Sequence, residues 1–257
     1  MCTSVLLFRK EHDWPLIIGS NRDEKLSRIS KFPARHWLKH HPQIIGGFDA
    51  EEKGSWIAIN DHGLFSVIHN RKLEKDNNLI KKSRGHIILK LLNFDRIDPA
   101  IECLRNLNQE IYNGFNIILG NKSLCFWGKH ISVDNKIEVK EVNEGLSILT
   151  DKDLNDLMDK KTNFYLNKFS QTSIPDPSNN NWLAWELLLS TETIENQTKP
   201  EEAICFINKI NNYGTRSSSL IAISNNFSIK QLINPFIFRS TEYSPNKSNF
   251  VDVEMVY

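Results

Sequence analysis

The chain begins MCTSVLLF (residues 1–8), passes through the polar stretch KEHDWP (10–15), and continues as LIIG (16–19) and SNRDE (20–24). Two apolar runs joined by a polar turn are typical of a β-hairpin. The sequence therefore predicts that the chain terminus pairs with a strand that ends in a cluster of charged residues.

The register of this hairpin follows from its turn. With the turn centred near His12, the residue numbers of antiparallel partners sum to about 24, so Cys2 lies opposite Arg22 and Ser4 lies opposite Ser20. Opposed residues share a face of the sheet, with their Cβ atoms about 4.5–5.5 Å apart. The alternative interpretation of NRDE is a solvated, charged turn at the end of a strand.

The composition is that of an ordinary globular protein, and we predict a single domain over residues 1–257. Hydrophobic residues make up 40% and charged residues 25%, and the formal net charge is +1. This near-neutral balance argues against a nucleic-acid binder. The apolar runs fall short of the roughly 20 residues that span a bilayer, and the amino terminus lacks the order of a signal peptide. We therefore expect no transmembrane segment and a cytoplasmic location.

The four cysteines form no CxxC pair and no zinc-like spacing with histidine, so we expect free thiols and no metal site. Cys103, Cys125 and Cys205 lie within apolar patterns and are interpreted as core residues.

Blocks of hairpin-connected strands alternate with blocks of helices, which predicts an α+β fold with antiparallel sheets that carry helices on their outer faces. A loop is expected at 171–181, and neither GxGxxG nor GxxxxGK[ST] occurs. Strands are predicted at 3–8, 16–19, 55–60, 64–69, 115–119, 124–127, 137–142, 146–149, 219–224, 227–232, 236–239 and 251–256. Helices are predicted from about 85 and 98, capped by Ser83 and Asp98, and at 154–169, 182–189 and 201–210.

Cys2 is the residue with the clearest chemical potential. Removal of Met1 would leave a thiol, with a pKa of about 8.5, and a free α-amine, with a pKa of about 7.7–8.0, on one residue. The amine then serves as the base for its own nucleophile, and no separate histidine is needed. Arg22 favours the thiolate by its charge, and Asp23 holds the α-ammonium. The alternative is that a small second residue has no catalytic meaning.

These residues carry a family resemblance. The start of the chain resembles the NRDE family, the transport-and-Golgi-organisation protein 2 group, and further matches follow along the whole chain. The matching segments are MCTSVLLF (1–8), SNRDE (20–24), GSWIAINDHGLFSVIHNR (54–71), SRGHII (83–88), YNGFNIILGN (112–121), GLS (145–147) and YGTRSSSLIAI (213–223).

The resemblance implies an amino-terminal-nucleophile (Ntn) hydrolase fold, a four-layer αββα sandwich of antiparallel sheets. It also implies similarity to the penicillin V acylase and bile-salt hydrolase group. By motif, Cys2 corresponds to the nucleophile and Asp23 to the residue that binds the new α-amine. Asn70 corresponds to an oxyanion-hole amide, and Arg216 to a strand-borne arginine near the thiolate.

The sequence departs from the acylase group at several positions. Ser20 stands where the acylases have an arginine, so Arg22 or Arg216 has to supply the positive charge. Asp151 falls near their second active-site asparagine, and Ile148 stands where the NRDE family has an asparagine after GLS. Asn21 and Asp151 are expected to contact the substrate.

The residues and the family resemblance together imply two function classes, of which the carrier class comes from the resemblance alone. A third class, a purely structural interaction protein, has no specific support. The first is a hydrolase or thioesterase that needs no cofactor and acts on a small amide or acyl substrate. The second is a carrier of haem, or of lipid or acyl-CoA, that keeps the fold without efficient hydrolysis. The segment RHWLKHHP (35–42) is interpreted as a polar loop anchored by Trp37. No histidine is named as a haem ligand. The histidines considered are His36, His40, His41, His69 and His86.

Overall fold

The computed structural model describes residues 2–77, 79–225 and 236–255, which form two compact units. The first unit comprises the chain up to Arg28 together with Glu144–Asn225 and Phe236–Val253. The second consists mainly of Ile29–Asn143. The predicted α+β class, with antiparallel sheets and helices, is confirmed in both units.

The first unit contains an antiparallel sheet with the strand order β10-β1-β2-β12-β13-β14 among the described residues, and β11 pairs with β12. β12 is central and far from its neighbour β2 in sequence, so the sheet joins the start of the chain to its last third. The strands are β1 (Thr3–Phe8), β2 (Leu16–Lys25), β10 (Gly145–Leu149), β11 (Ile207–Asn208), β12 (Tyr213–Ile223), β13 (Phe236–Ser240) and β14 (Val251–Asp252).

The predicted register of the first hairpin is confirmed, because Ser4 pairs with Ser20 across β1 and β2. Continuing this pattern past Thr3, which pairs with Asn21, sets Cys2 against Arg22. The position of the turn therefore sufficed to predict the register of this hairpin.

β12 pairs along the other edge of β2 and contains an irregularity at the charged end. Thr215 pairs with Asp23 and Ser217 pairs with Arg22, so Arg216 forms a bulge between them. Such a bulge changes the direction of a side chain relative to its neighbours, and here it occurs beside the predicted site.

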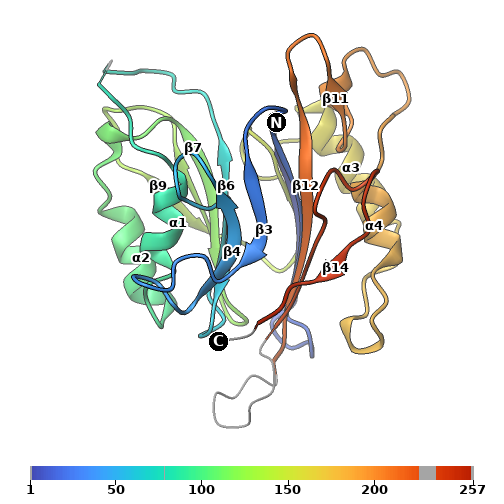
Figure 1. Ribbon diagram of the computed structural model, residues 1–257, viewed down its shortest axis with the longest axis horizontal. Coiled ribbons are helices and arrows are strands. Elements are labelled where there is room, and N and C mark those ends of the chain that lie inside the picture. The colour runs from blue at the N-terminus through green and yellow to red at the C-terminus, as the bar shows by residue number, and fades with distance from the viewer. Residues whose placement is uncertain (1, 78, 226–235, 256–257) are drawn as a thin grey trace. The chain divides into compact units, whose positions relative to one another are not determined.

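Helices α3 (Lys160–Ser170) and α4 (Leu183–Leu189) pack against one face of this sheet, as Figure 1 shows. Alternate strand residues on that face point to the helices, and aromatic side chains fill the space between them. The cluster includes Val5, Leu7, Ile17, Ile148, Leu220 and Ala222 from the strands, with Tyr165, Phe169, Trp182, Trp185 and Leu189 from the helical side.

The second unit is a meander, since its strands pair in sequence order from β3 to β9. Helices α1 (Gly85–Leu91) and α2 (Ile97–Arg105) cover one face of this sheet (Figure 1) and share a core of buried aliphatic residues with β6 and β7. The strands are β3 (Ser30–Ala34), β4 (Ile44–Asp49), β5 (Ile57–Asn60), β6 (Phe65–Asn70), β7 (Phe115–Gly120), β8 (Cys125–His130) and β9 (Glu138–Glu141).

The helix at 201–210 was predicted wrongly. A 3₁₀ turn at Pro200–Glu202 is followed by extended chain and β11. Ala203, Ile204, Cys205 and Phe206 are all buried in succession, which a helix with one apolar face would not do.

Other boundaries differ by shorter distances. α3 begins at Lys160 rather than 154, because Asp159 caps it, and the caps of α1 and α2 are Arg84 and Arg96 rather than Ser83 and Asp98. β3 and β4 were not predicted, and the predicted strand 227–232 lies outside the described residues. Of the helices that the structure describes, none has the length and apolarity needed to cross a membrane.

Candidate functional site

Cys2 lies directly before β1 and its thiol contacts the backbone of β2. The Asp23 N–H donates to Cys2 Sγ at 3.3 Å, and the thiol donates to the Asp23 carbonyl at 3.5 Å. The side chain is half-buried and free of any disulfide, as are the other cysteines. The hairpin therefore holds this sulfur at a fixed position on the strand end.

Asp23 is fixed in turn by β12. The Thr215 hydroxyl donates to Asp23 Oδ1 at 2.7 Å, and the Tyr213 hydroxyl donates to the Asp23 carbonyl at 2.8 Å. Thr215 also accepts the Phe206 N–H at 3.1 Å. Asp23 is only 1% exposed, and the Thr215 hydroxyl is one of the groups that orient its carboxylate.

Gly214, in the same YGTRSS segment, lies where no side chain fits. A Cβ at this position would be 2.5 Å from the Phe206 carbonyl oxygen. This close approach lets β11 pair with the part of β12 that carries Tyr213 and Thr215.

Two arginines occur at this strand end. Arg22 is 4% exposed, and its positive charge acts on the Cys2 thiol in the direction that favours the thiolate. Arg216 is half-buried at the bulge, and its Nε has no hydrogen-bond partner in the part of the chain that the structure describes. The first unit thus brings Cys2, Arg22 and Asp23 together, with Arg216 on the adjacent strand.

The surroundings of Cys2 disfavour its thiolate form. Burial raises the pKa of the Cys2 thiol, and the negative charge of Asp23 raises this pKa further, while Arg22 opposes both effects. Burial likewise raises the pKa of the Tyr213 phenol. A nucleophilic attack by Cys2 therefore needs a base that removes the thiol proton.

Lys161 is a residue of this neighbourhood that the sequence did not reveal. It lies in the first turn of α3, is 8% exposed, and its Nζ has no hydrogen-bond partner within the described chain. Burial lowers the pKa of its ammonium group, and the charges of Asp23 and Cys2 oppose this shift. A lone lysine in a polar segment gives no sequence signal, because its burial depends on tertiary packing.

The two predicted substrate-contacting residues occupy different environments. Asn21 is fully buried, and its Nδ2 donates to the carbonyls of Leu189 at 2.8 Å and Ile204 at 2.9 Å, so it ties β2 to the helical layer. Asp151 follows β10, and its carboxylate lies 3.6 Å from Lys152 Nζ. A role in substrate contact stays a prediction for both residues.

The position after GLS is used for packing. Ile148 is fully buried in the core beneath α3 and α4. Asn155, further along the chain, accepts the Ile148 N–H at 2.7 Å and donates to Ser147 Oγ at 3.1 Å. An asparagine amide therefore reaches this strand from a neighbouring turn.

Asn70, the predicted oxyanion donor, belongs to the second unit. It is the last residue of β6, pairs with Phe115, and has an exposed side chain. Its participation in a site with Cys2 stays a prediction.

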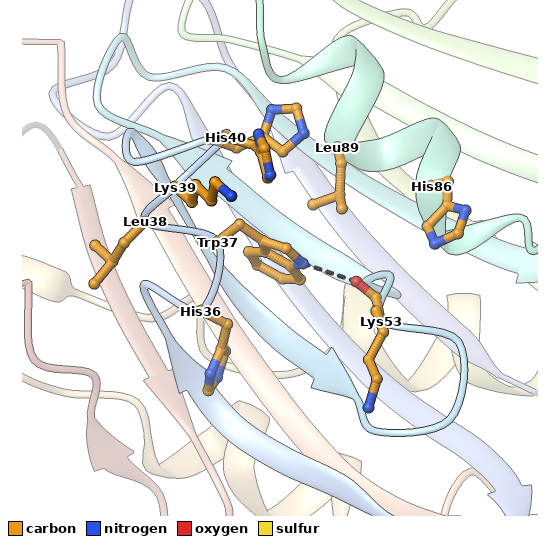
Figure 2. Close-up of a pocket in the computed structure, with 9 residues that line it drawn as sticks. His36, Trp37, Leu38, Lys39, His40, Lys53, His86 and Leu89 are labelled. Atoms are coloured by element: carbon orange, nitrogen blue, oxygen red, sulfur yellow. Dashed lines mark hydrogen bonds between the residues drawn. The ribbon is translucent and has the colours of Figure 1, made fainter.

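The histidine-rich segment RHWLKHHP forms the loop between β3 and β4 and lines a pocket of about 390 Å³ together with residues of α1. Figure 2 shows Trp37 among these side chains, with its indole N–H donating to the Lys53 carbonyl at 2.8 Å. This confirms the prediction that Trp37 anchors a polar loop. His69, by contrast, is buried within β6.

Most of the pocket histidines already use a ring nitrogen within the protein. His36 contacts the Phe32 carbonyl at 2.8 Å, His41 contacts Asn93 Oδ1 at 3.2 Å, and His86 contacts the Glu52 carbonyl. His40 is exposed and has no such contact among the described residues. Among all the residues that the structure describes, no group of three or more His, Cys, Asp or Glu side chains is arranged to hold a metal ion.

The model of the family described as Transport and Golgi organisation 2 matches residues 1–232. A comparison with curated proteins found no match.

Solved structures with a similar fold are Ntn hydrolases. An N-acylethanolamine-hydrolyzing acid amidase ortholog from Caenorhabditis elegans has 14% identity and a TM-score of 0.56, over 89% of this chain and 94% of that one. Penicillin V acylase from Agrobacterium tumefaciens has 12% identity and a TM-score of 0.53, over 99% and 86%. A mutant conjugated bile acid hydrolase from Clostridium perfringens has 12% identity and a TM-score of 0.51, over 100% and 99%. The predicted fold class is confirmed.

Proposed function

Since the chain belongs to the Transport and Golgi organisation 2 family and has an Ntn-hydrolase fold, we propose that it hydrolyses a small amide or thioester with Cys2 as the nucleophile. The observation that carries this proposal is the contact of the Cys2 thiol with Asp23, whose own carboxylate is locked by Thr215. The contact between Thr215 and Asp23 helps to hold the residue that contacts the nucleophile. A chain terminus without a catalytic role would not need this support.

The first step depends on loss of Met1. The α-amine of Cys2 then takes the thiol proton, directly or through one water, and the sulfur attacks the substrate carbonyl carbon. Asp23 holds the resulting α-ammonium by charge. Because burial raises the pKa of this thiol, removal of its proton is an essential part of the barrier.

The later steps return the proton and release the acyl group. The carbonyl oxygen becomes an oxyanion, for which Asn70 and a backbone N–H are the proposed donors. The α-ammonium protonates the leaving amine or thiol, the C–N or C–S bond breaks, and a thioester with Cys2 remains. Water, deprotonated by the same amine, then hydrolyses this thioester and restores the thiol.

The structural relatives support the class of bond. They are named as an amidase, an acylase and a conjugated bile acid hydrolase, and we extend the amide-hydrolase class to this chain as part of the proposal. Arg22 and Arg216 are proposed to balance negative charge at the sulfur, in place of an arginine at Ser20.

The test is hydrolysis of a panel of small amides and thioesters by the wild type, Cys2→Ala and Cys103→Ala. Intact mass of the purified protein shows whether Met1 has been removed. Turnover that persists in Cys103→Ala and is lost in Cys2→Ala is the expected result. A wild-type protein that lacks Met1 and turns over no member of the panel contradicts the proposal.

Haem carriage is the second candidate function, and the exposed His40 ring in the histidine-lined pocket is the observation that favours it. His40 would serve as the axial ligand, beside the apolar surface of Trp37 and Leu89. Haem titration should then give a Soret shift that His40→Ala abolishes and His62→Ala retains. Absence of any spectral change on titration contradicts this candidate.

A further inference from the structure

Lys161 is a buried cation without a matching anion. Its side chain is 8% exposed, its Nζ has no hydrogen-bond partner among the described residues, and the ammonium lies 5.6 Å from the centroid of the Phe206 ring. Burying an ammonium group without a partner is costly, and such groups are rare in native proteins.

The carboxylates around Lys161 are engaged elsewhere. Asp159 caps α3 by accepting the Thr162 N–H at 3.0 Å and the Thr162 hydroxyl at 2.7 Å. Asp151 lies 3.6 Å from Lys152 Nζ, and Asp23 accepts the Thr215 hydroxyl. These carboxylates attract Lys161 through space, but its Nζ has no hydrogen-bond partner among the described residues.

A structural role does not account for this lysine. It is the second residue of α3, where the helix dipole is positive and disfavours a cation. A methionine would fill the same volume against Phe206 without the desolvation cost. The charge therefore needs another explanation. Phe206, whose ring faces the Lys161 ammonium, donates its backbone N–H to Thr215, and Thr215 donates to Asp23, so Lys161 lies next to the residues that hold Cys2.

We propose that Lys161 binds an anionic group of the substrate, so that the compounds cleaved at Cys2 carry a carboxylate close to the scissile carbonyl. The ammonium and the first-turn N–H groups of α3 both favour a negative charge at this position. The substrate class rests on the proposed hydrolase function, whereas an anion site beside the Cys2 thiol can be measured without it.

The test of the site is the alkylation of Cys2 by iodoacetate, which carries a carboxylate, and by iodoacetamide, its neutral counterpart. In both reactions the sulfur attacks the methylene carbon, a C–S bond forms, iodide leaves, and the thiol proton passes to the buffer. The ratio of the two rates at Cys2, measured by peptide mass spectrometry, reports the local preference for an anion. Cys103 in the same protein is the internal reference.

Lys161→Met should lower the iodoacetate-to-iodoacetamide ratio at Cys2 about tenfold, because a charge-assisted contact of ordinary strength is lost. Lys161→Arg should retain most of the ratio. Lys160→Met is the matched control, since it removes the neighbouring exposed lysine that pairs with Glu202 at 2.9 Å. The Cys103 ratio should stay constant in every variant.

The proposal is overturned if Lys161→Met leaves the Cys2 ratio unchanged, or if Lys160→Met lowers it equally. The thermal midpoint supplies a second readout. Removal of a buried unpaired charge should leave it unchanged or raise it, whereas a structural lysine would lower it.

The substrate class is tested with an N-acylglycine and the matching N-acylglycinamide. Wild-type kcat/KM should favour the carboxylate, and Lys161→Met should lower kcat/KM about tenfold for that substrate only. Equal losses for both substrates overturn the assignment of substrate class. A Lys161-dependent alkylation ratio in a protein that hydrolyses neither compound would contradict the proposed hydrolysis and support the anion site.

Discussion

The backbone N–H of Asp23 donates to Cys2 Sγ at 3.3 Å, across the first hairpin of the chain. Asp23 therefore acts on the thiol in two opposite ways. Its backbone hydrogen bond lowers the pKa of the thiol, and the charge of its carboxylate raises this pKa. These two effects can be separated, because a substitution can remove the charge and leave the backbone contact in place.

Asp23→Asn is expected to lower the pH at which Cys2 ionises. Burial and the Asp23 carboxylate both raise the pKa of this thiol, so the wild-type alkylation rate should keep rising at pH values above the range of an ordinary cysteine. Removing the negative charge favours the thiolate and moves the midpoint to lower pH. The measurement is the pH profile of iodoacetamide labelling at Cys2 in protein that retains Met1. A midpoint that stays in place or rises would show that Asp23 does not act on the sulfur through its charge.

Thr215→Val should both weaken the site and destabilise the first unit. The Thr215 hydroxyl donates to Asp23 Oδ1 and accepts the Phe206 N–H, so valine leaves two buried polar groups without their partner. We expect a loss of about 1–3 kcal/mol in the free energy of unfolding. Urea denaturation measures this loss, with the exposed Thr193→Val as control. A thermodynamically neutral Thr215→Val would mean that Asp23 is held by other contacts.

The pairing of the charged hairpin could be predicted from the sequence, whereas the residues that pack around it could not. The position of the polar turn near His12 predicted the pairing of Ser4 with Ser20, because the turn of a hairpin sets the register of its two strands. Arg216 was identified from its motif, but the bulge that sets its direction depends on pairing with β2. Lys161 could not be found, since nothing in a polar helix start distinguishes a buried lysine from an exposed one.

The wrong helix at 201–210 has a related cause. Its apolar residues are buried by tertiary packing from all sides, and Ile204 supplies the backbone carbonyl that Asn21 binds. A short apolar run of this kind fits a helix or an extended segment equally well until its neighbours are known.

Asn21→Leu should reduce stability rather than alter substrate preference. Its amide nitrogen donates to two carbonyls, and leucine would leave both carbonyls buried and unsatisfied. A loss of about 2–4 kcal/mol is expected from the two hydrogen bonds. Denaturant unfolding provides the measurement, and Asn163→Leu on the exposed face of α3 is the control. If the variant is as stable as wild type but has a changed KM, Asn21 contacts substrate instead.

Asp151→Asn tests the departure from the acylase group at the end of β10. An ionised aspartate only accepts hydrogen bonds, whereas an asparagine amide can donate to a developing oxyanion. Loss of one oxyanion donor in other enzymes costs about 10²–10³ in rate, so restoring a donor here should raise kcat by at least about tenfold if Asp151 lies beside the reacting carbonyl.

The kinetic measurement distinguishes this role from a charge effect. A gain in kcat with little change in KM indicates transition-state stabilisation, whereas a change in KM alone indicates altered binding. Asp156→Asn, on the loop before α3, changes the same charge and serves as the control. Equal effects of Asp151→Asn and Asp156→Asn on kcat would assign the result to net charge and remove Asp151 from the site, because only a side chain that touches the substrate can gain from a new amide donor.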